Sequence, residues 1–117
     1  GRAALHELTH HGIEAYLVND EKVTNVIPGL DMVLMGCDTL LVSEFLNKTG
    51  TLRIAESARK HKIPFILVTE SRKQIGTRNW KRSVQPDPLF EWVPLDLVTA
   101  IITESEIKEA PWILNVP

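Results

Sequence analysis

Apolar residues along this chain follow two spacings in turn, one typical of amphipathic helices and one typical of buried strands. Helical spacing occupies residues 3–11 and returns after Thr51, where Leu52, Ala55 and Ala58 share one face. Mainly apolar runs predict strands at residues 13–18, 31–35, 64–69 and 97–103, and a short helix is expected over 21–27. Strands that are apolar along their whole length are usually covered on both faces. The alternation therefore predicts an α/β fold with a mainly parallel sheet.

Glycine, threonine and proline set the expected boundaries of these elements. Gly12 is expected to end the first helix, and Thr51 is expected to cap the later one. Residues 71–90 are polar, basic and proline-containing, which predicts a loop. The loop contains Trp80 and the basic residues Arg72, Lys73, Arg78, Lys81 and Arg82. Basic residues together with an aromatic side chain can bind RNA, but a solvated loop is the favoured interpretation.

Composition narrows the classes of function. The chain of 117 residues suffices for one domain, expected over residues 1–117. A net charge of −2, from 13 basic and 15 acidic side chains, favours neither nucleic acid nor an anionic membrane as a partner. A single cysteine, Cys37, cannot form an internal disulfide, and no apolar run is long enough to span a bilayer, so we expect a cytoplasmic setting. Adjacent residues of a helix such as His10 and His11 point in different directions, so no metal site is expected there. No cofactor is expected either.

Candidate chemistry is concentrated where a loop is expected to turn into a helix. A helix start leaves backbone N–H groups unpaired and carries a partial positive charge, so a lysine and two hydroxyl groups there suit a phosphate. Asp38 lies just upstream, at the end of a predicted strand. A carboxylate near an anion cradle indicates a phosphorylated ligand that undergoes proton transfer. The predicted ligand-binding residues are Asn47, Lys48, Thr49, Gly50 and Thr51.

Acidic residues also follow each predicted strand: Asp20, Asp38, Glu70 and Glu104. In open parallel sheets ligands bind beyond the carboxyl ends of the strands, so these side chains mark the expected ligand edge. Any strand that leaves a core meets polar residues, and the pattern alone therefore does not establish a site.

The order of these pieces resembles the C-terminal domain of one superfamily. It joins the alpha, beta and delta regulatory subunits of eukaryotic translation initiation factor 2B to methylthioribose-1-phosphate isomerase and ribose-1,5-bisphosphate isomerase. The most specific matching piece is residues 47–51, and the other matching residues are Gly1-Arg2, Gly12-Ile13, Asp20, Gly36-Cys37-Asp38, Ala55, Ala58, Pro64-Phe65, Glu70, Phe90-Glu91, Pro94 and Ile101-Ile102-Thr103-Glu104.

This resemblance implies a partial Rossmann-like three-layer domain, the C-terminal part of a longer family protein. It also implies a proton-transfer role for Asp38 in an aldose–ketose conversion, with Asn47 and Lys48 holding a phosphorylated sugar or nucleotide. A partly buried aspartate can have its pKa raised for such work. The family's C-terminal domain forms dimer contacts, which implies a homo-oligomer or an assembly with related subunits. Phe90, Trp92 and Trp112 are either core residues or candidates for that surface.

Departures from the family pattern keep the function open. The catalytic cysteine of the isomerases lies upstream of the segment that matches Gly1-Arg2, so Cys37 is not its equivalent. Ser43-Glu44-Phe45 replaces the usual Asn-Gly turn before Lys48. An isomerase domain that is inactive alone and a regulatory or assembly subunit of the translation-factor type both remain. So does a structural fragment, in which Asp38 caps a turn, Lys48 is solvated, and Thr49, Gly50 and Thr51 serve only the helix start.

Overall fold

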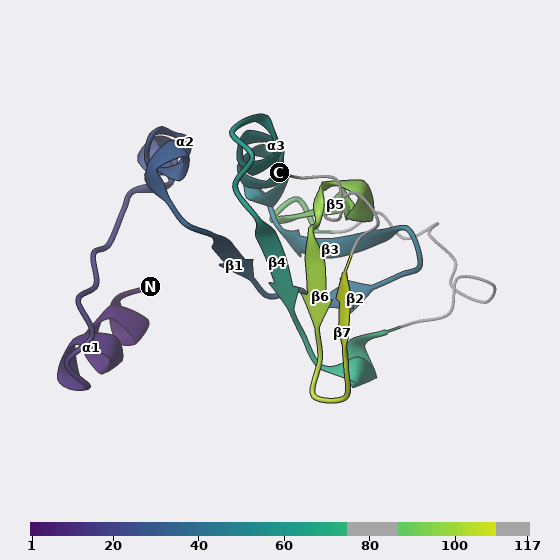
Figure 1. Cartoon of the computed structure of the whole chain (residues 1–117), viewed down its shortest axis with the longest axis horizontal. Coiled ribbons are helices and arrows are strands. Elements are labelled where there is room, and N and C mark those ends of the chain that lie inside the picture. Colours follow the sequence, from purple (N-terminus) through teal and green to yellow (C-terminus); the bar gives the residue numbers. More distant parts are fainter. Residues whose placement is uncertain (75–86, 110–117) are drawn as a thin grey trace.

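The computed structural model describes residues 1–74 and 87–109 (Figure 1). Its α-helices are α1 Arg2–His10, α2 Val23–Val26 and α3 Thr51–Lys60. Its strands are β1 Val33–Met35, β2 Thr39–Leu40, β3 Glu44–Lys48, β4 Phe65–Val68, β5 Phe90–Pro94, β6 Ala100–Ile102 and β7 Ile107–Glu109. No helix in the described part of the chain is long and apolar enough to cross a membrane.

The strands form two sheets. One sheet has the order β1-β4-β6-β7, with parallel pairing of β1 with β4 and of β4 with β6, and antiparallel pairing of β6 with β7. The other is antiparallel, in the order β2-β3-β5. Figure 1 shows α3 beside both sheets. The predicted α/β class with a mainly parallel sheet is confirmed.

The core lies where α3 meets the strands. Ala55 and Ala58 are fully buried on α3, and their small side chains allow the helix backbone to approach the strands closely. Phe65 of β4 and Phe45 of β3 are also fully buried, with ring centroids 6.3 Å apart. The predicted helical face and the predicted strand over 64–69 are thereby confirmed in their central residues.

The other face of the parallel sheet is open in the described structure. Leu34 of β1 and Val68 of β4 are 61% and 44% exposed, while their strand neighbours Val33 and Leu67 are buried. The expectation that these strands are covered on both faces is therefore wrong for the chain described here.

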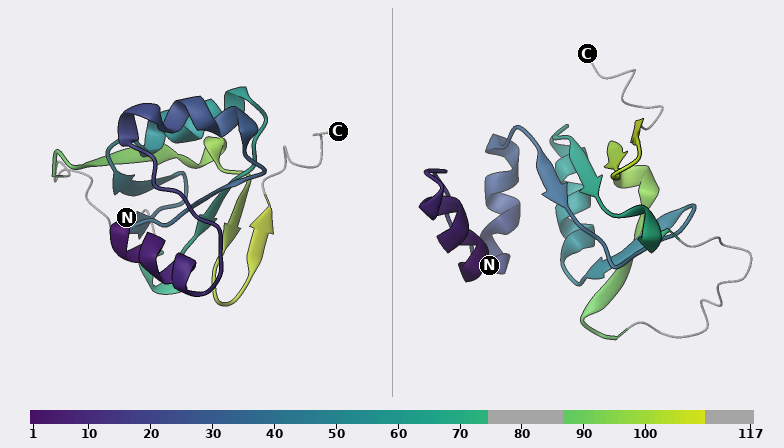
Figure 2. Two further views of the ribbon diagram at one scale, coloured as in Figure 1. Left: turned by 90° about the vertical axis from the view of Figure 1, so that its left-hand side faces the viewer. Right: turned by 90° about the horizontal axis from the view of Figure 1, so that it is seen from below.

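The strand predicted at residues 13–18 is also wrong. This stretch has no regular secondary structure and no hydrogen-bonded neighbour strand among the described residues, where β1 pairs only with β4. Figure 2 shows α1 and the stretch after it on one side of the molecule, away from the sheets. A parallel strand needs a neighbour for its backbone N–H and C=O groups, and apolar side chains alone do not supply one.

The prediction also missed the antiparallel sheet. Asn47 and Lys48 are the last two residues of β3, not part of a loop. Thr51 is the first residue of α3, and the N-cap is Gly50, whose φ of 107° lies in the left-handed region that favours glycine. The expected cap at Thr51 is therefore wrong by one residue, because the tight turn from β3 into α3 requires this backbone conformation.

The predicted loop at 71–90 is only partly described. A 3-10 turn spans Ser71–Lys73, and β5 begins at Phe90. The RNA-binding alternative that rests on Arg78, Trp80, Lys81 and Arg82 lies outside the described residues, as does the expectation for Trp112.

Candidate functional site

A pocket of about 490 Å³ lies at the first turn of α3, and we name it the α3-start pocket. It contains all five predicted ligand-binding residues, from Asn47 to Thr51. The other lining residues come from the segment before α2, from α2 itself, from β1, from α3 and from β5: Asp20, Val23, Thr24, Met35, Leu52, Arg53, Ile54 and Glu91. The five residues predicted from the sequence therefore line one pocket, but the prediction omitted Arg53 and Glu91, which line it too.

Several of these polar side chains hold the turn between β3 and α3. The Asn47 amide donates to the Thr51 hydroxyl at 3.0 Å, and that hydroxyl donates to the Lys48 carbonyl at 2.7 Å. Thr51 is buried, so its hydroxyl needs these partners. The Thr49 hydroxyl donates to the Pro88 carbonyl at 2.9 Å. Asn47, Thr49 and Thr51 thus have structural contacts, and their ligand-binding role stays a prediction.

The Glu91 carboxylate of β5 occupies the N-terminal end of α3. Its Oε2 atom accepts hydrogen bonds from the backbone N–H groups of Gly50 at 2.8 Å and Leu52 at 3.0 Å. A carboxylate at this end of a helix is favourable, because it meets both the N–H donors and the positive end of the helix dipole. These two amides were expected to be unpaired, but a protein anion already binds them.

The spacing of residues in the sequence did not predict that Glu91 lies at the start of α3. It follows Gly50 by 41 residues and reaches α3 because β5 pairs with β3, which places Asn47 opposite Glu91. Only the matching Phe90-Glu91 pair in the resemblance marked this position. The Lys48 ammonium and the Arg53 guanidinium are thus the cations that the pocket offers to a ligand anion.

Asp38 does not line the α3-start pocket. Its side chain is exposed, not partly buried as expected, and its backbone N–H donates to the Leu46 carbonyl at 2.9 Å. The neighbouring Cys37 is buried, and its thiol donates to the Thr69 hydroxyl at 3.3 Å. Burial raises the pKa of the Cys37 thiol. The Lys73 ammonium donates to the Cys37 carbonyl at 3.0 Å and so anchors the segment that carries Asp38.

Glu70 and Glu104 lie together at the carboxyl ends of β4 and β6, as the strand-exit pattern predicts. They line a shallow hollow of about 430 Å³ together with Lys73. The Ser71 hydroxyl and backbone N–H lower the pKa of Glu104, and the Arg72 guanidinium lowers the pKa of Glu70. Asp20 differs from this pattern, because it follows no strand and belongs to the α3-start pocket. The described residues contain no group of three His, Cys, Asp or Glu side chains that could hold a metal ion.

The sequence of the chain matches one known protein family. The sequence model of the Initiation factor 2 subunit family matches residues 1–87. The chain belongs to this family. Its curated relatives include the methylthioribose-1-phosphate isomerase of Desulforudis audaxviator, 31% identical over 133 aligned residues that cover 91% of this chain and 38% of the relative. The ribose 1,5-bisphosphate isomerase of Archaeoglobus fulgidus is 30% identical over 127 aligned residues, which cover 89% of this chain and 40% of the relative.

A solved structure in the family has the same fold. The structure described as translation initiation factor eIF-2B, subunit delta, from A. fulgidus superposes with a TM-score of 0.79 at 29% identity. The match covers 95% of this chain and 40% of that structure. The chain therefore spans about two fifths of the length of the family members that it matches. The predicted membership of the superfamily is confirmed.

Proposed function

We propose that the α3-start pocket binds a phosphorylated sugar or nucleotide, as the C-terminal part of an aldose–ketose isomerase of the ribose-1,5-bisphosphate or methylthioribose-1-phosphate type. The observation that carries this proposal is the mixture of charges in the pocket. The cations of Lys48 and Arg53 suit a phosphate group, and the carboxylates of Asp20 and Glu91 can accept hydrogen bonds from sugar hydroxyls. The names of the relatives support the substrate class.

The proposed division of roles separates binding from chemistry. Phosphate binding by Lys48 and Arg53 supplies binding energy at a point remote from the reacting carbons. Asp38 is the proposed group for proton transfer between adjacent sugar carbons. Because Asp38 is exposed and lies outside the α3-start pocket, the sugar would have to extend from the pocket toward the end of β1. Residues 1–117 on their own are proposed to be inactive, because the resemblance places the catalytic cysteine of the isomerases upstream of the segment that matches Gly1-Arg2.

Binding is tested by titrating the full chain with ribose-1,5-bisphosphate in a calorimeter. Lys48→Ala should weaken binding by about tenfold, because it removes one of two cations from the pocket. Lys108→Ala is the matched control, because Lys108 is an exposed lysine of β7 outside this pocket. Equal affinities of wild type and Lys48→Ala would reject the proposed site.

Catalysis is tested with the same polypeptide and both sugar phosphates. No turnover is expected from the full chain alone. Measurable turnover that disappears in Asp38→Asn would overturn the proposed inactivity and would establish Asp38 as catalytic.

A regulatory or assembly subunit of the translation initiation factor 2B type is the second candidate. The superposition on the solved eIF-2B delta subunit favours it. Under this proposal the chain is cytoplasmic and forms oligomers with itself or with related subunits. Sedimentation of the chain alone and with purified initiation-factor subunits tests the proposal. A monomer that binds none of these subunits would reject it.

A further inference from the structure

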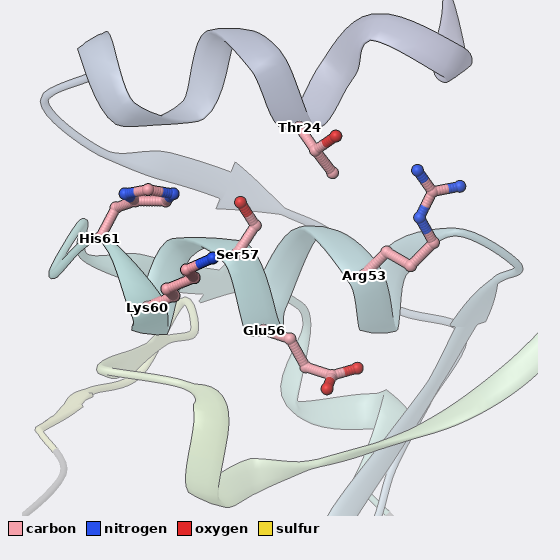
Figure 3. A pocket seen from close by; sticks show the side chains of 6 residues that line it. All are labelled: Thr24, Arg53, Glu56, Ser57, Lys60 and His61. Atoms are coloured by element: carbon pink, nitrogen blue, oxygen red, sulfur yellow. The ribbon is translucent and has the colours of Figure 1, made fainter.

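A separate groove of about 580 Å³ lies between α2 and α3, and we name it the α2–α3 groove. Figure 3 shows its lining side chains. Thr24 belongs to α2, and the other lining residues belong to α3 or follow its last residue: Arg53, Glu56, Ser57, Lys60 and His61. Only Thr24 and Arg53 also line the α3-start pocket, so Ser57, Lys60 and His61 distinguish the two sites.

The donors of the groove form one stripe on the helix. Arg53, Ser57, Lys60 and His61 recur at i, i+4, i+7 and i+8, which places them on one side of α3. Figure 3 shows Ser57 and His61 directed toward α2, and Thr24 directed from α2 toward this stripe. The Glu56 carboxylate points away from α2. The space between the helices is therefore lined by hydrogen-bond donors, with its one acidic side chain turned outward.

In the described part of the chain, the two permanent cations of the groove, Arg53 and Lys60, have no carboxylate partner. Among the described residues, no ion pair joins Arg53 or Lys60 to an acidic side chain, although Glu56 lies three and four residues from them along α3. Unpaired cations along a groove attract anions through their summed field. The negative end of the α3 dipole near Lys60 opposes an anion, but a full cation there outweighs about half an elementary charge.

The length of the stripe determines which anion fits. Lys60 follows Arg53 by seven positions along the α-helix, which is about 10 Å along the axis. The Arg53 guanidinium lies at one end of the groove in Figure 3 and the His61 ring at the other. A single phosphate would reach one end only, whereas a chain of linked phosphates would place charge at both. The hydroxyls of Thr24 and Ser57 would donate to oxygens in the middle of such a chain.

We propose that the α2–α3 groove is a second ligand site that binds a linear polyphosphate, either inorganic or the phosphate chain of a nucleotide. The site shares Thr24 and Arg53 with the α3-start pocket, but Ser57, Lys60 and His61 lie outside that pocket, and the inference does not depend on the isomerase proposal. Arg53 forms bidentate hydrogen bonds with one end of the chain, His61 contacts the other end, and Lys60 supplies a point charge between them. Because the groove is open to solvent, binding weakens as salt concentration rises.

The test is calorimetric titration of the full chain with tripolyphosphate, ATP and orthophosphate at low salt. Tripolyphosphate should bind about tenfold more tightly than orthophosphate, because only the chain reaches both ends of the stripe. The double variant Lys60→Gln/His61→Gln should lose about tenfold in tripolyphosphate affinity, and the control Lys108→Gln should lose none. ATP that binds more tightly than tripolyphosphate would identify a nucleotide as the source of the phosphate chain, and equal binding would identify the chain itself as the recognised group.

Two results would overturn the proposal. One is equal affinity of the wild type and the double variant for tripolyphosphate. The other is a loss of tripolyphosphate binding in Lys48→Ala but not in the double variant, which would assign the anion to the α3-start pocket. Backbone amide chemical shifts provide a readout that needs no variant, since Ser57 and His61 should shift on addition of tripolyphosphate while Lys48 should not.

Discussion

Two apolar stretches of this chain, residues 13–18 and β4, had the same predicted structure and have different ones. Phe65 and Leu67 of β4 are fully buried, whereas Ile13 and Leu17 are 51% and 54% exposed. Both stretches are rich in apolar residues with high strand propensity. β4 has a neighbour strand on each side and α3 across one face, while residues 13–18 have no paired neighbour in the described structure. An apolar pattern shows that a stretch can form a buried strand, and the neighbouring strands and helices decide whether it does.

The largest expected effect concerns one large apolar side chain in each stretch, buried in β4 and exposed in residues 13–18. Phe65→Ala should lower the free energy of unfolding by about 3–5 kcal/mol, because it removes a fully buried ring from contact with Phe45. Leu17→Ala is the matched change in the other stretch and should cost less than about 0.5 kcal/mol. Urea denaturation followed by circular dichroism measures both values. Similar losses for the two variants would show that residues 13–18 are packed in solution.

The next largest loss of stability is expected when the Glu91 carboxylate at the start of α3 is neutralised. Glu91→Gln should lower the free energy of unfolding by about 1.5–3 kcal/mol, because the carboxylate accepts from two backbone amides at the start of α3. Glu14→Gln is the control, since Glu14 is an exposed carboxylate in the N-terminal region. The same urea titration detects the difference. If Glu91→Gln is as stable as the wild type, the helix start does not depend on this carboxylate.

A pair of threonines sharpens the comparison further. Thr51→Val should cost about 1 kcal/mol, because its buried hydroxyl both donates to the Lys48 carbonyl and accepts from the Asn47 amide. The Thr9 hydroxyl donates to the Leu5 carbonyl at 2.7 Å, but on an exposed face of α1 where water can replace it. Thr9→Val should therefore change the melting temperature by less than Thr51→Val does. The reverse order in thermal melts would contradict this view of the two regions.

The smallest expected effect on stability comes from cleavage of the N-terminal region. Chymotrypsin should cut first after Tyr16 or Leu17, because Tyr16 is 78% exposed and neither residue is held in a strand. The fully buried Phe45 and Phe65 should resist cleavage under the same conditions. Mass spectrometry of early fragments, followed by a thermal melt of the cleaved protein, tests both points. Early cleavage at Phe45 or Phe65 would show that the core opens as readily as the N-terminal region.

The sequence by itself determined the strongest local elements. The spacing of Leu52, Ala55 and Ala58 predicted the buried side of α3, and the apolar runs predicted the centres of β1, β4 and β6. It also placed the five candidate residues from Asn47 to Thr51 in one pocket, because consecutive residues at a turn into a helix are close in any fold.

Only the tertiary structure decided the contacts between distant segments. The antiparallel sheet has short strands with polar residues such as Glu44 and Asn47, so it left no clear apolar period to detect. The arrival of Glu91 at the start of α3 depends on the register of β5 against β3, and the α2–α3 groove depends on where two helices meet. Such contacts arise from packing between residues far apart in sequence, and local propensity contains no information about them.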